Sequence, residues 1–139
     1  VYGQQPVENL LLTHFDAFWL DRFMAPEDRV DRIILSFCNP WSQRANQFKR
    51  RLTHPHQLLQ YRQILTPGGE IHFKTDDDGL FSASREYFKA CGFEEAYVTP
   101  DLHASGYAPN YVTEHEQLFA AQGVPIKFLI ARMGELPTA

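Results

Sequence analysis

The feature of this sequence that most constrains its fold is the alternation of short apolar runs with amphipathic segments. The apolar runs that predict strands cover residues 9–13, 30–37, 70–75, 93–98 and 125–133. The segments with helical periodicity cover residues 18–24, 53–65, 78–91 and 113–121. Strands that alternate with helices indicate an α/β domain built on a mostly parallel sheet. The apolar character of residues 30–37 favours a strand that is covered on both faces.

Turn and capping residues mark where the predicted helices begin and end. Thr53 predicts the N-cap of one helix, and the Pro-Gly-Gly sequence at residues 67–69 predicts its end. Gly92 is expected to close the next helix. Thr113, followed three residues later by Glu116, matches a capping box at the start of the last helix.

Length and composition favour one globular domain. A chain of 139 residues with 44% hydrophobic and 22% charged residues is ordinary for a folded domain, which argues against disorder. No run approaches the ~20 apolar residues of a membrane helix, and no export leader is recognisable at Val1. Cys38 and Cys91 are expected to be reduced thiols. We therefore expect a cytoplasmic protein without a membrane partner.

Charge is distributed unevenly along the chain. The net charge of −4 argues against a protein that coats nucleic acid nonspecifically. Basic side chains nevertheless gather in one stretch, at Arg44, Lys49, Arg50, Arg51, His54 and His56. Acidic side chains gather at residues 76–78 and at Glu114 and Glu116. The whole-chain sum therefore hides a local basic patch. The acids at residues 76–78 can be read as a helix start, and nothing in the sequence demands a metal.

The segment that carries the most chemical information follows the strand predicted at residues 30–37. Ligands on parallel sheets collect beyond the carboxyl ends of the strands, and Asn39, Pro40 and Trp41 stand at such an end. An aromatic ring close to guanidinium groups suits a nucleic acid, because rings stack on bases and cations bind phosphates. The same residues also allow a solvated loop in which Trp41 packs as part of the core.

Several longer segments resemble one known family. Residues 37–54, FCNPWSQRANQFKRRLTH, resemble the segment F-x-D-P-W-P-K-K-R-H-x-K-R-R-L-T of bacterial tRNA (guanine-N7) methyltransferases. The resemblance continues in GGEIHFKTDDDGLF at residues 68–81, in DLHAS at residues 101–105 and in TEHEQLFAAQGVPIKFLIAR at residues 113–132. Upstream, LTHFDA at residues 12–17 is similar to the family strand that lines the adenine. The segments occur in the family's order over nearly the whole chain.

The resemblance implies a fold, a reaction and a partner. The fold would be a Rossmann-like, S-adenosylmethionine-dependent methyltransferase domain at residues 1–139, with a mostly parallel sheet and an antiparallel last strand. The reaction would transfer a methyl group from S-adenosylmethionine to N7 of a guanine in the variable loop of tRNA. The family's first two strands, its glycine-rich cofactor loop and its ribose-binding acid are expected before Val1. The oligomeric state stays open between monomer and homodimer.

The resemblance also assigns residues by position. Asp16 would contact the adenine of the cofactor, and Asn39 stands at the catalytic, cofactor-adjacent aspartate of the family. The substrate-contacting positions are Gln43, Asp76, Thr113, Glu114, His115 and Glu116. The RNA-contacting positions are Arg44, Lys49, Arg50 and Arg51. We expect the turn around Pro40 and the segment that begins at Thr113 to meet at a single pocket.

Two departures from the family pattern bear on activity. Asn39 replaces an aspartate and Gln43 replaces a lysine, which leaves open an alternative function as a catalytically weak tRNA-binding module. Guanine N7 already carries a lone pair, so its methylation needs no general base. An amide at residue 39 keeps the shape of the aspartate and one acceptor oxygen but loses the charge. We therefore predict weakened rather than abolished chemistry.

Overall fold

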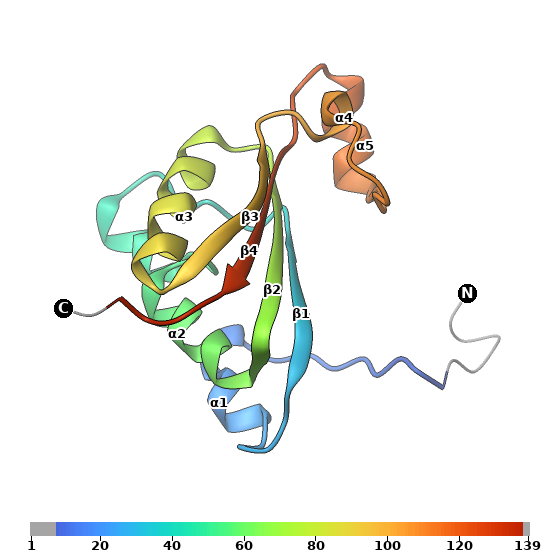
Figure 1. Ribbon diagram of the computed structural model, residues 1–139. Coiled ribbons are helices and arrows are strands. Elements are labelled where there is room, and N and C mark those ends of the chain that lie inside the picture. The colour runs from blue at the N-terminus through green and yellow to red at the C-terminus, as the bar shows by residue number, and fades with distance from the viewer. Residues whose placement is uncertain (1–7, 138–139) are drawn as a thin grey trace.

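A mixed sheet organises the part of the chain that the computed structural model describes, residues 8–137 (Figure 1). The sheet has the strand order β1-β2-β4-β3. Its strands are β1 (Val30–Ser36), β2 (Leu65–Thr75), β3 (Phe93–Thr99) and β4 (Lys127–Met133). β1 and β2 pair in parallel, whereas β4 is antiparallel to both of its neighbours. The expected α/β class with an antiparallel last strand is therefore confirmed, while the expected mostly parallel sheet has, among residues 8–137, one parallel and two antiparallel strand pairs.

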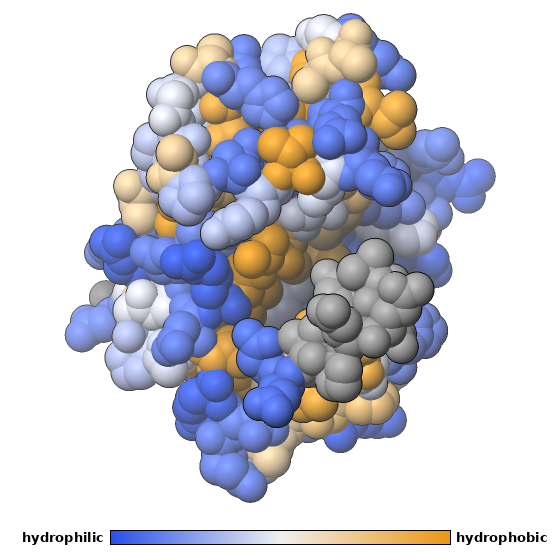
Figure 2. All heavy atoms as spheres, turned by 90° about the vertical axis from the view of Figure 1, so that its right-hand side faces the viewer, coloured by the Kyte–Doolittle hydropathy of each residue, from blue (hydrophilic) through white to orange (hydrophobic). Residues whose placement is uncertain are grey.

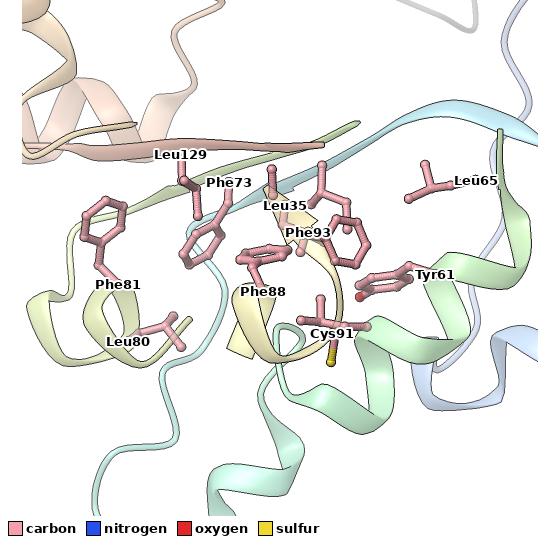
Figure 3. Close-up of a cluster of buried hydrophobic side chains, with 13 residues drawn as sticks. Leu35, Tyr61, Leu65, Phe73, Leu80, Phe81, Phe88, Cys91, Phe93 and Leu129 are labelled. Atoms are coloured by element: carbon pink, nitrogen blue, oxygen red, sulfur yellow. The ribbon is translucent and has the colours of Figure 1, made fainter. Parts of the chain in front are cut away.

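Two helices cover one face of this sheet and form the core with it. They are α2 (Pro55–Ile64) and α3 (Asp78–Ala90), and both lie on the same side in Figure 1. Figure 3 shows the side chains that meet between these layers. The ring of Phe88 on α3 lies 6.4 Å from that of Phe73 on β2 and 5.5 Å from that of Phe93 on β3. Burying each such side chain stabilises the fold by about 1.5–3 kcal/mol.

Short helices lie near the start of the described chain, after β1 and at one edge of the sheet. The first are η1 (Ala17–Trp19) and α1 (Leu20–Phe23), and η2 (Ala45–Arg50) follows β1. The helices α4 (Leu102–Ser105) and α5 (Glu114–Ala121) lie beyond the carboxyl ends of β1 and β2 (Figure 1). α4, a single turn, was not among the predicted helices. None of the helices described is both long and apolar enough to cross a bilayer.

The prediction of a strand at residues 9–13 is wrong. This segment forms no strand, and its side chains Leu11 and Leu12 are 96% and 78% exposed. An apolar run becomes a strand only where a neighbouring strand satisfies its backbone hydrogen bonds, and no described residue pairs with it. The expected burial of both faces of β1 is also wrong, because Ile34 is 66% exposed. Figure 2 shows apolar side chains in a hollow on this side of the molecule.

The predicted start and end of helix α2 both differ from those in the structure. The N-cap of α2 is His54, whose Nδ1 accepts a hydrogen bond from the His56 N–H at 3.2 Å. Thr53, the predicted cap, is buried instead, and its hydroxyl lies 2.6 Å from Ser84 Oγ on α3. α2 ends at Ile64, and the Pro-Gly-Gly sequence already belongs to β2. Sequence signals thus place the helix but not the side chain that caps it.

Gly92 is required where α3 turns back into β3, and we expect alanine there to destabilise the protein. Gly92 has φ +82°, and a Cβ at this position would lie 2.5 Å from the Glu135 carbonyl oxygen. Gly123 has a similar φ of +76°, yet a Cβ there would meet nothing within 4 Å. Gly123→Ala should cost only the left-handed conformation, about 1–2 kcal/mol, whereas Gly92→Ala should cost more. Urea unfolding of the full-length protein measures both; equal losses would contradict the steric argument.

Candidate functional site

A cavity of about 1020 Å³ lies beside the turn that follows β1. Three segments line it: the start of η1, the turn at residues 38–41, and the chain from η2 to the start of α2. Asp16 and Asn39 both border this cavity. Most of the remaining wall is apolar, with Phe18, Trp41 and Leu52 among its members. The structure therefore brings together the two residues that the resemblance assigns to the cofactor.

Side chains of α2 hold Asp16 at the cavity. The Gln57 side chain, which is fully buried, donates a hydrogen bond to the Ala17 carbonyl oxygen at 2.7 Å. Gln60 donates to the Phe18 carbonyl oxygen at 3.0 Å. Asp16 Oδ1 in turn accepts from the Phe18 N–H at 2.9 Å and caps η1. The orientation of the carboxylate is thus set by the backbone, and its second oxygen has no hydrogen-bond partner within residues 8–137 and can accept from a ligand.

The turn after β1 has an unusual backbone conformation. Phe37 and Trp41 have φ angles of +55° and +49°, which are disfavoured for residues with a Cβ. Asn39 Oδ1 accepts a hydrogen bond from the Trp41 N–H at 2.9 Å. The NH₂ group of Asn39 makes no hydrogen bond to any residue in the described range 8–137. Asn39 is exposed, so it offers a ligand a donor where the aspartate implied by the resemblance would offer a second oxygen.

Two of the predicted RNA-contacting cations stand at this cavity. Lys49 and Arg50 line it and are exposed. The guanidinium carbon of Arg50 lies 5.2 Å from the centre of the Trp41 ring, within range of a cation–π interaction. Gln43 and Arg44 are also exposed, but they lie just before η2 and do not line the cavity. The basic patch therefore begins at the cavity and continues away from it.

Arg51 differs from its predicted role as an RNA contact. Only 4% of the residue is exposed. Its guanidinium group contacts other parts of the chain, so it has almost no surface to offer a phosphate. The resemblance groups it with Arg44, Lys49 and Arg50, whereas the structure separates it from them.

A second, smaller hollow of about 330 Å³ lies at the start of α5. Thr113, Glu114 and His115 line it together with Ser36 and Phe37 from the end of β1. The Phe37 ring lies 6.2 Å from the His115 ring. Because Phe37 borders this hollow and the next residue borders the larger cavity, both lie at the same edge of the sheet. The single pocket that we expected is therefore two hollows with the turn between them.

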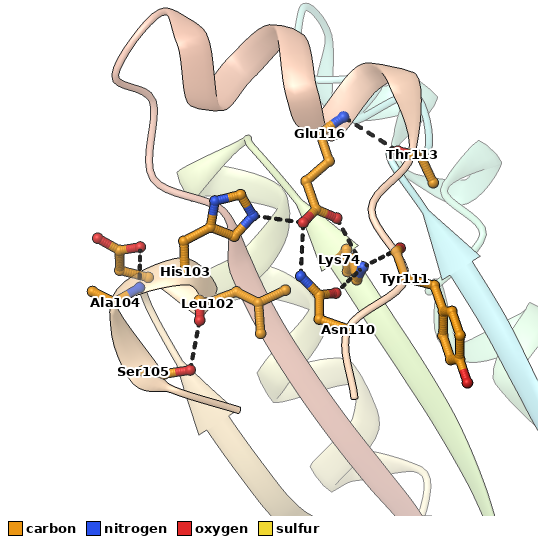
Figure 4. A network of polar contacts seen from close by, with 10 residues as sticks. Lys74, Leu102, His103, Ala104, Ser105, Asn110, Tyr111, Thr113 and Glu116 are labelled. Carbon is orange, nitrogen blue, oxygen red and sulfur yellow. Dashed lines mark hydrogen bonds and ion pairs between the residues drawn. The ribbon is translucent and has the colours of Figure 1, made fainter. Parts of the chain in front are cut away.

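Glu116 lies in a buried polar network rather than in either hollow (Figure 4). The residue has no exposed surface. Its carboxylate accepts from Lys74 Nζ at 2.8 Å and from Asn110 Nδ2 at 2.9 Å, and it lies 2.6 Å from His103 Nε2. The Glu116 N–H donates to Thr113 Oγ1 at 3.2 Å, so the cap is confirmed. The carboxylate does not return to Thr113 and joins three other segments instead.

Burial and hydrogen bonding act on Glu116 in opposite directions. Burial favours the neutral acid, but the hydrogen bonds from Lys74, His103 and Asn110 and the charge of Lys74 outweigh it. The pKa of Glu116 is therefore lowered from its ordinary value. Its three partners were not among the predicted site residues. The only signal was that Lys74 and His103 fall within the segments at residues 68–81 and 101–105 that resemble the family.

Asp76 stands at the carboxyl end of β2 but lines neither hollow. Its carbonyl oxygen accepts from the buried Lys127 Nζ at 2.9 Å, and the same Nζ lies 2.9 Å from Asp78 Oδ1. Asp77 caps α3, since its Oδ1 accepts from the Leu80 N–H at 2.7 Å. The helix-start interpretation is thus confirmed for Asp77, while the half-buried carboxylate of Asp76 has no such task within residues 8–137.

Comparisons with known proteins give matches over most of the chain. Residues 2–129 match the model of a family described as "Putative methyltransferase". The chain is 53% identical over 126 residues to a tRNA (guanine-N(7)-)-methyltransferase of Clostridium perfringens (strain SM101 / Type A), a match that covers 91% of this chain and 57% of the relative. It is 48% identical over 124 residues to the protein of the same name from Acetivibrio thermocellus, covering 89% and 56%. The chain therefore spans about half the length of the curated relatives it matches.

We expect Glu116→Gln to destabilise the protein at neutral pH, because it leaves the buried Lys74 ammonium without its counter-charge. Breaking a buried pair in this way typically costs about 3–5 kcal/mol. Because the folded-state pKa is lowered, the stabilisation is complete above the ordinary pKa of Glu and is lost as the pH falls through the folded-state pKa. The difference between wild type and variant should therefore shrink as urea unfolding is repeated from pH 7 down to pH 3.

Glu114→Gln is the matched control, since Glu114 lies in the same helical turn but is exposed. It should lose no more than the helix-dipole contribution, about 0.3–1 kcal/mol. Equal losses for the two variants would show that the Glu116 network adds no stability.

Proposed function

The chain belongs to this methyltransferase family, and on that premise we propose that the full-length protein transfers a methyl group from S-adenosylmethionine to N7 of a guanine in the variable loop of tRNA. The observation that carries the proposal is the meeting of Asp16 and Asn39 at one cavity, with Lys49 and Arg50 at its border. The relatives that match most of the chain carry this activity in their names. The partner is tRNA, and the expected compartment is the cytoplasm.

The larger cavity fits the proposed methyl donor. Its apolar wall suits a purine ring. The second carboxylate oxygen of Asp16 can accept from an adenine amino group, and the Asn39 amide can hydrogen-bond a polar part of the same molecule. When bound, the donor supplies an electrophilic methyl group on a positively charged sulfur.

The residues of this chain have few chemical tasks, because guanine N7 needs no deprotonation before it reacts. They must hold N7 in line with the methyl group, and positioning of this kind supplies about 7–11 kcal/mol. They must also stabilise the positive charge that the guanine gains. Glu114 is suited to this task, because it is an exposed carboxylate in the hollow that Phe37 and His115 line.

The exposed cations bind the rest of the tRNA. Arg44, Lys49 and Arg50 project from the segment around η2, and the last two border the cavity. With a net charge of −4, the chain lacks a general attraction for RNA, so this patch must supply the phosphate contacts. Phosphate contacts at the border of the cavity would place the variable loop over the methyl donor.

The decisive experiment is a methyl-transfer assay with the full-length protein, unmodified tRNA and isotope-labelled S-adenosylmethionine. We expect label in the tRNA, and mass spectrometry of nuclease fragments should place it on a variable-loop guanine. Binding of tRNA without transfer would favour the alternative function as a tRNA-binding module. Label on another base or another atom would refute the proposed specificity.

Asn39→Asp should raise the rate of methyl transfer without changing the fold. An aspartate can still accept from the Trp41 N–H, and it replaces the free NH₂ group by a second oxygen and a negative charge. We expect kcat to rise roughly tenfold or more, equivalent to about 1.4 kcal/mol, with an unchanged melting temperature. Asn39→Ala is the control and should lower both quantities. An aspartate variant no faster than wild type would remove residue 39 from the reacting centre.

A further inference from the structure

Arg50 and Arg51 are neighbours in the sequence, yet their side chains lie in opposite environments. Arg50 is exposed and lies over the Trp41 ring. Arg51 is 4% exposed. An arginine that loses its water is usually retained because its guanidinium group makes directed hydrogen bonds within the protein. The contacts of Arg51 therefore indicate its role.

The Arg51 guanidinium group joins three segments of the chain. Its Nε donates to the Pro40 carbonyl oxygen in the turn after β1 at 2.7 Å. Its Nη1 donates to the Tyr87 hydroxyl on α3 at 3.1 Å. Its central carbon lies 4.0 Å from the centre of the Phe48 ring on η2. The turn is thus tied to a helix that is itself anchored in the core.

The Pro40–Trp41 peptide is held at both of its polar atoms. Its carbonyl oxygen accepts from Arg51, and its N–H donates to Asn39 Oδ1. Trp41 has a φ of +49°, a conformation that costs about 1–2 kcal/mol without compensating contacts. These two hydrogen bonds offset that cost, and Asn39 and Trp41 both border the larger cavity.

We propose that Arg51 is a positioning residue, which holds the Pro40–Trp41 peptide so that Asn39 and Trp41 keep their places at the cavity, and that it makes no contact with tRNA phosphates. The inference rests on the proposed function, because it names the part of that site on which Arg51 acts. It assigns opposite roles to the two neighbours, with Arg50 on the RNA surface and Arg51 beneath the turn.

The test compares Arg50→Met with Arg51→Met in the full-length protein. Arg50→Met should lower the slope of log Kobs for tRNA against log salt by about one, which is the loss of one phosphate contact. Arg51→Met should leave that slope unchanged and lower kcat by roughly 10- to 100-fold, the size expected when a reacting group is displaced. Arg51→Lys should recover part of kcat, because an ammonium group can still donate to Pro40. Arg85→Met, which removes an exposed pair with Glu95, should change neither quantity.

Hydrogen exchange followed by mass spectrometry gives a readout that does not depend on methyl transfer. The amides of Asn39, Trp41 and Ser42 should exchange faster in Arg51→Met than in wild type, and Arg50→Met should not show this change. If Arg51→Met does not fold, Tyr87→Phe, which removes one partner of Arg51, should show a smaller change in the same direction. A salt slope lowered by Arg51→Met, or unchanged exchange and kcat, would overturn the proposal. Absent methylation in wild type would refute the function, while exchange would still decide the role of Arg51.

Discussion

The site depends on how the chain leaves β1. Phe37 and Trp41 both adopt positive φ angles, and the residues between them are turned out of the line of the strand. This reversal points Phe37 towards α5 and leaves Asn39 and Trp41 at the larger cavity. A relaxed backbone here would separate these groups, because the following residues would continue in a different direction. The hydrogen bonds around the turn are therefore as important to the site as its surface residues.

Buried charges hold the edge of the sheet in place. Glu116 ties α5, α4 and β2 together through Lys74 and His103, while Arg51 ties the turn to α3. Such groups are costly to bury unless every polar atom is satisfied, so their partners are as specific as those of a ligand. The resemblance assigned Glu116 to the substrate and Arg51 to RNA. Both lie beneath the surface that they were expected to form.

The sequence predicted most of the fold, because the period of the apolar residues is a local signal. The strands at residues 30–37, 93–98 and 125–133 and the helices at residues 53–65, 78–91 and 113–121 each match an observed element closely. The predicted strand at residues 9–13 failed, since pairing depends on a neighbour rather than on the run itself. For the site, the sequence gives the charge of a side chain but not its burial, so Arg50 and Arg51 looked equivalent. The Glu116 network could not be predicted from the sequence either, because Lys74 is separated from Glu116 by 42 residues along the chain.

The peptide group between Pro40 and Trp41, whose carbonyl oxygen and N–H are both hydrogen-bonded, has a consequence for how the site can change. Both polar atoms of that peptide already have a hydrogen-bond partner within the chain, so a ligand meets mainly the side chains attached to the turn. The backbone of the turn and its ligand-binding groups can therefore change separately. A substitution at residue 39 alters the group that a ligand contacts, while the backbone conformation of the turn is kept. Exchanging Asn39 for aspartate is a change of this kind, because a carboxylate can still accept from the Trp41 N–H.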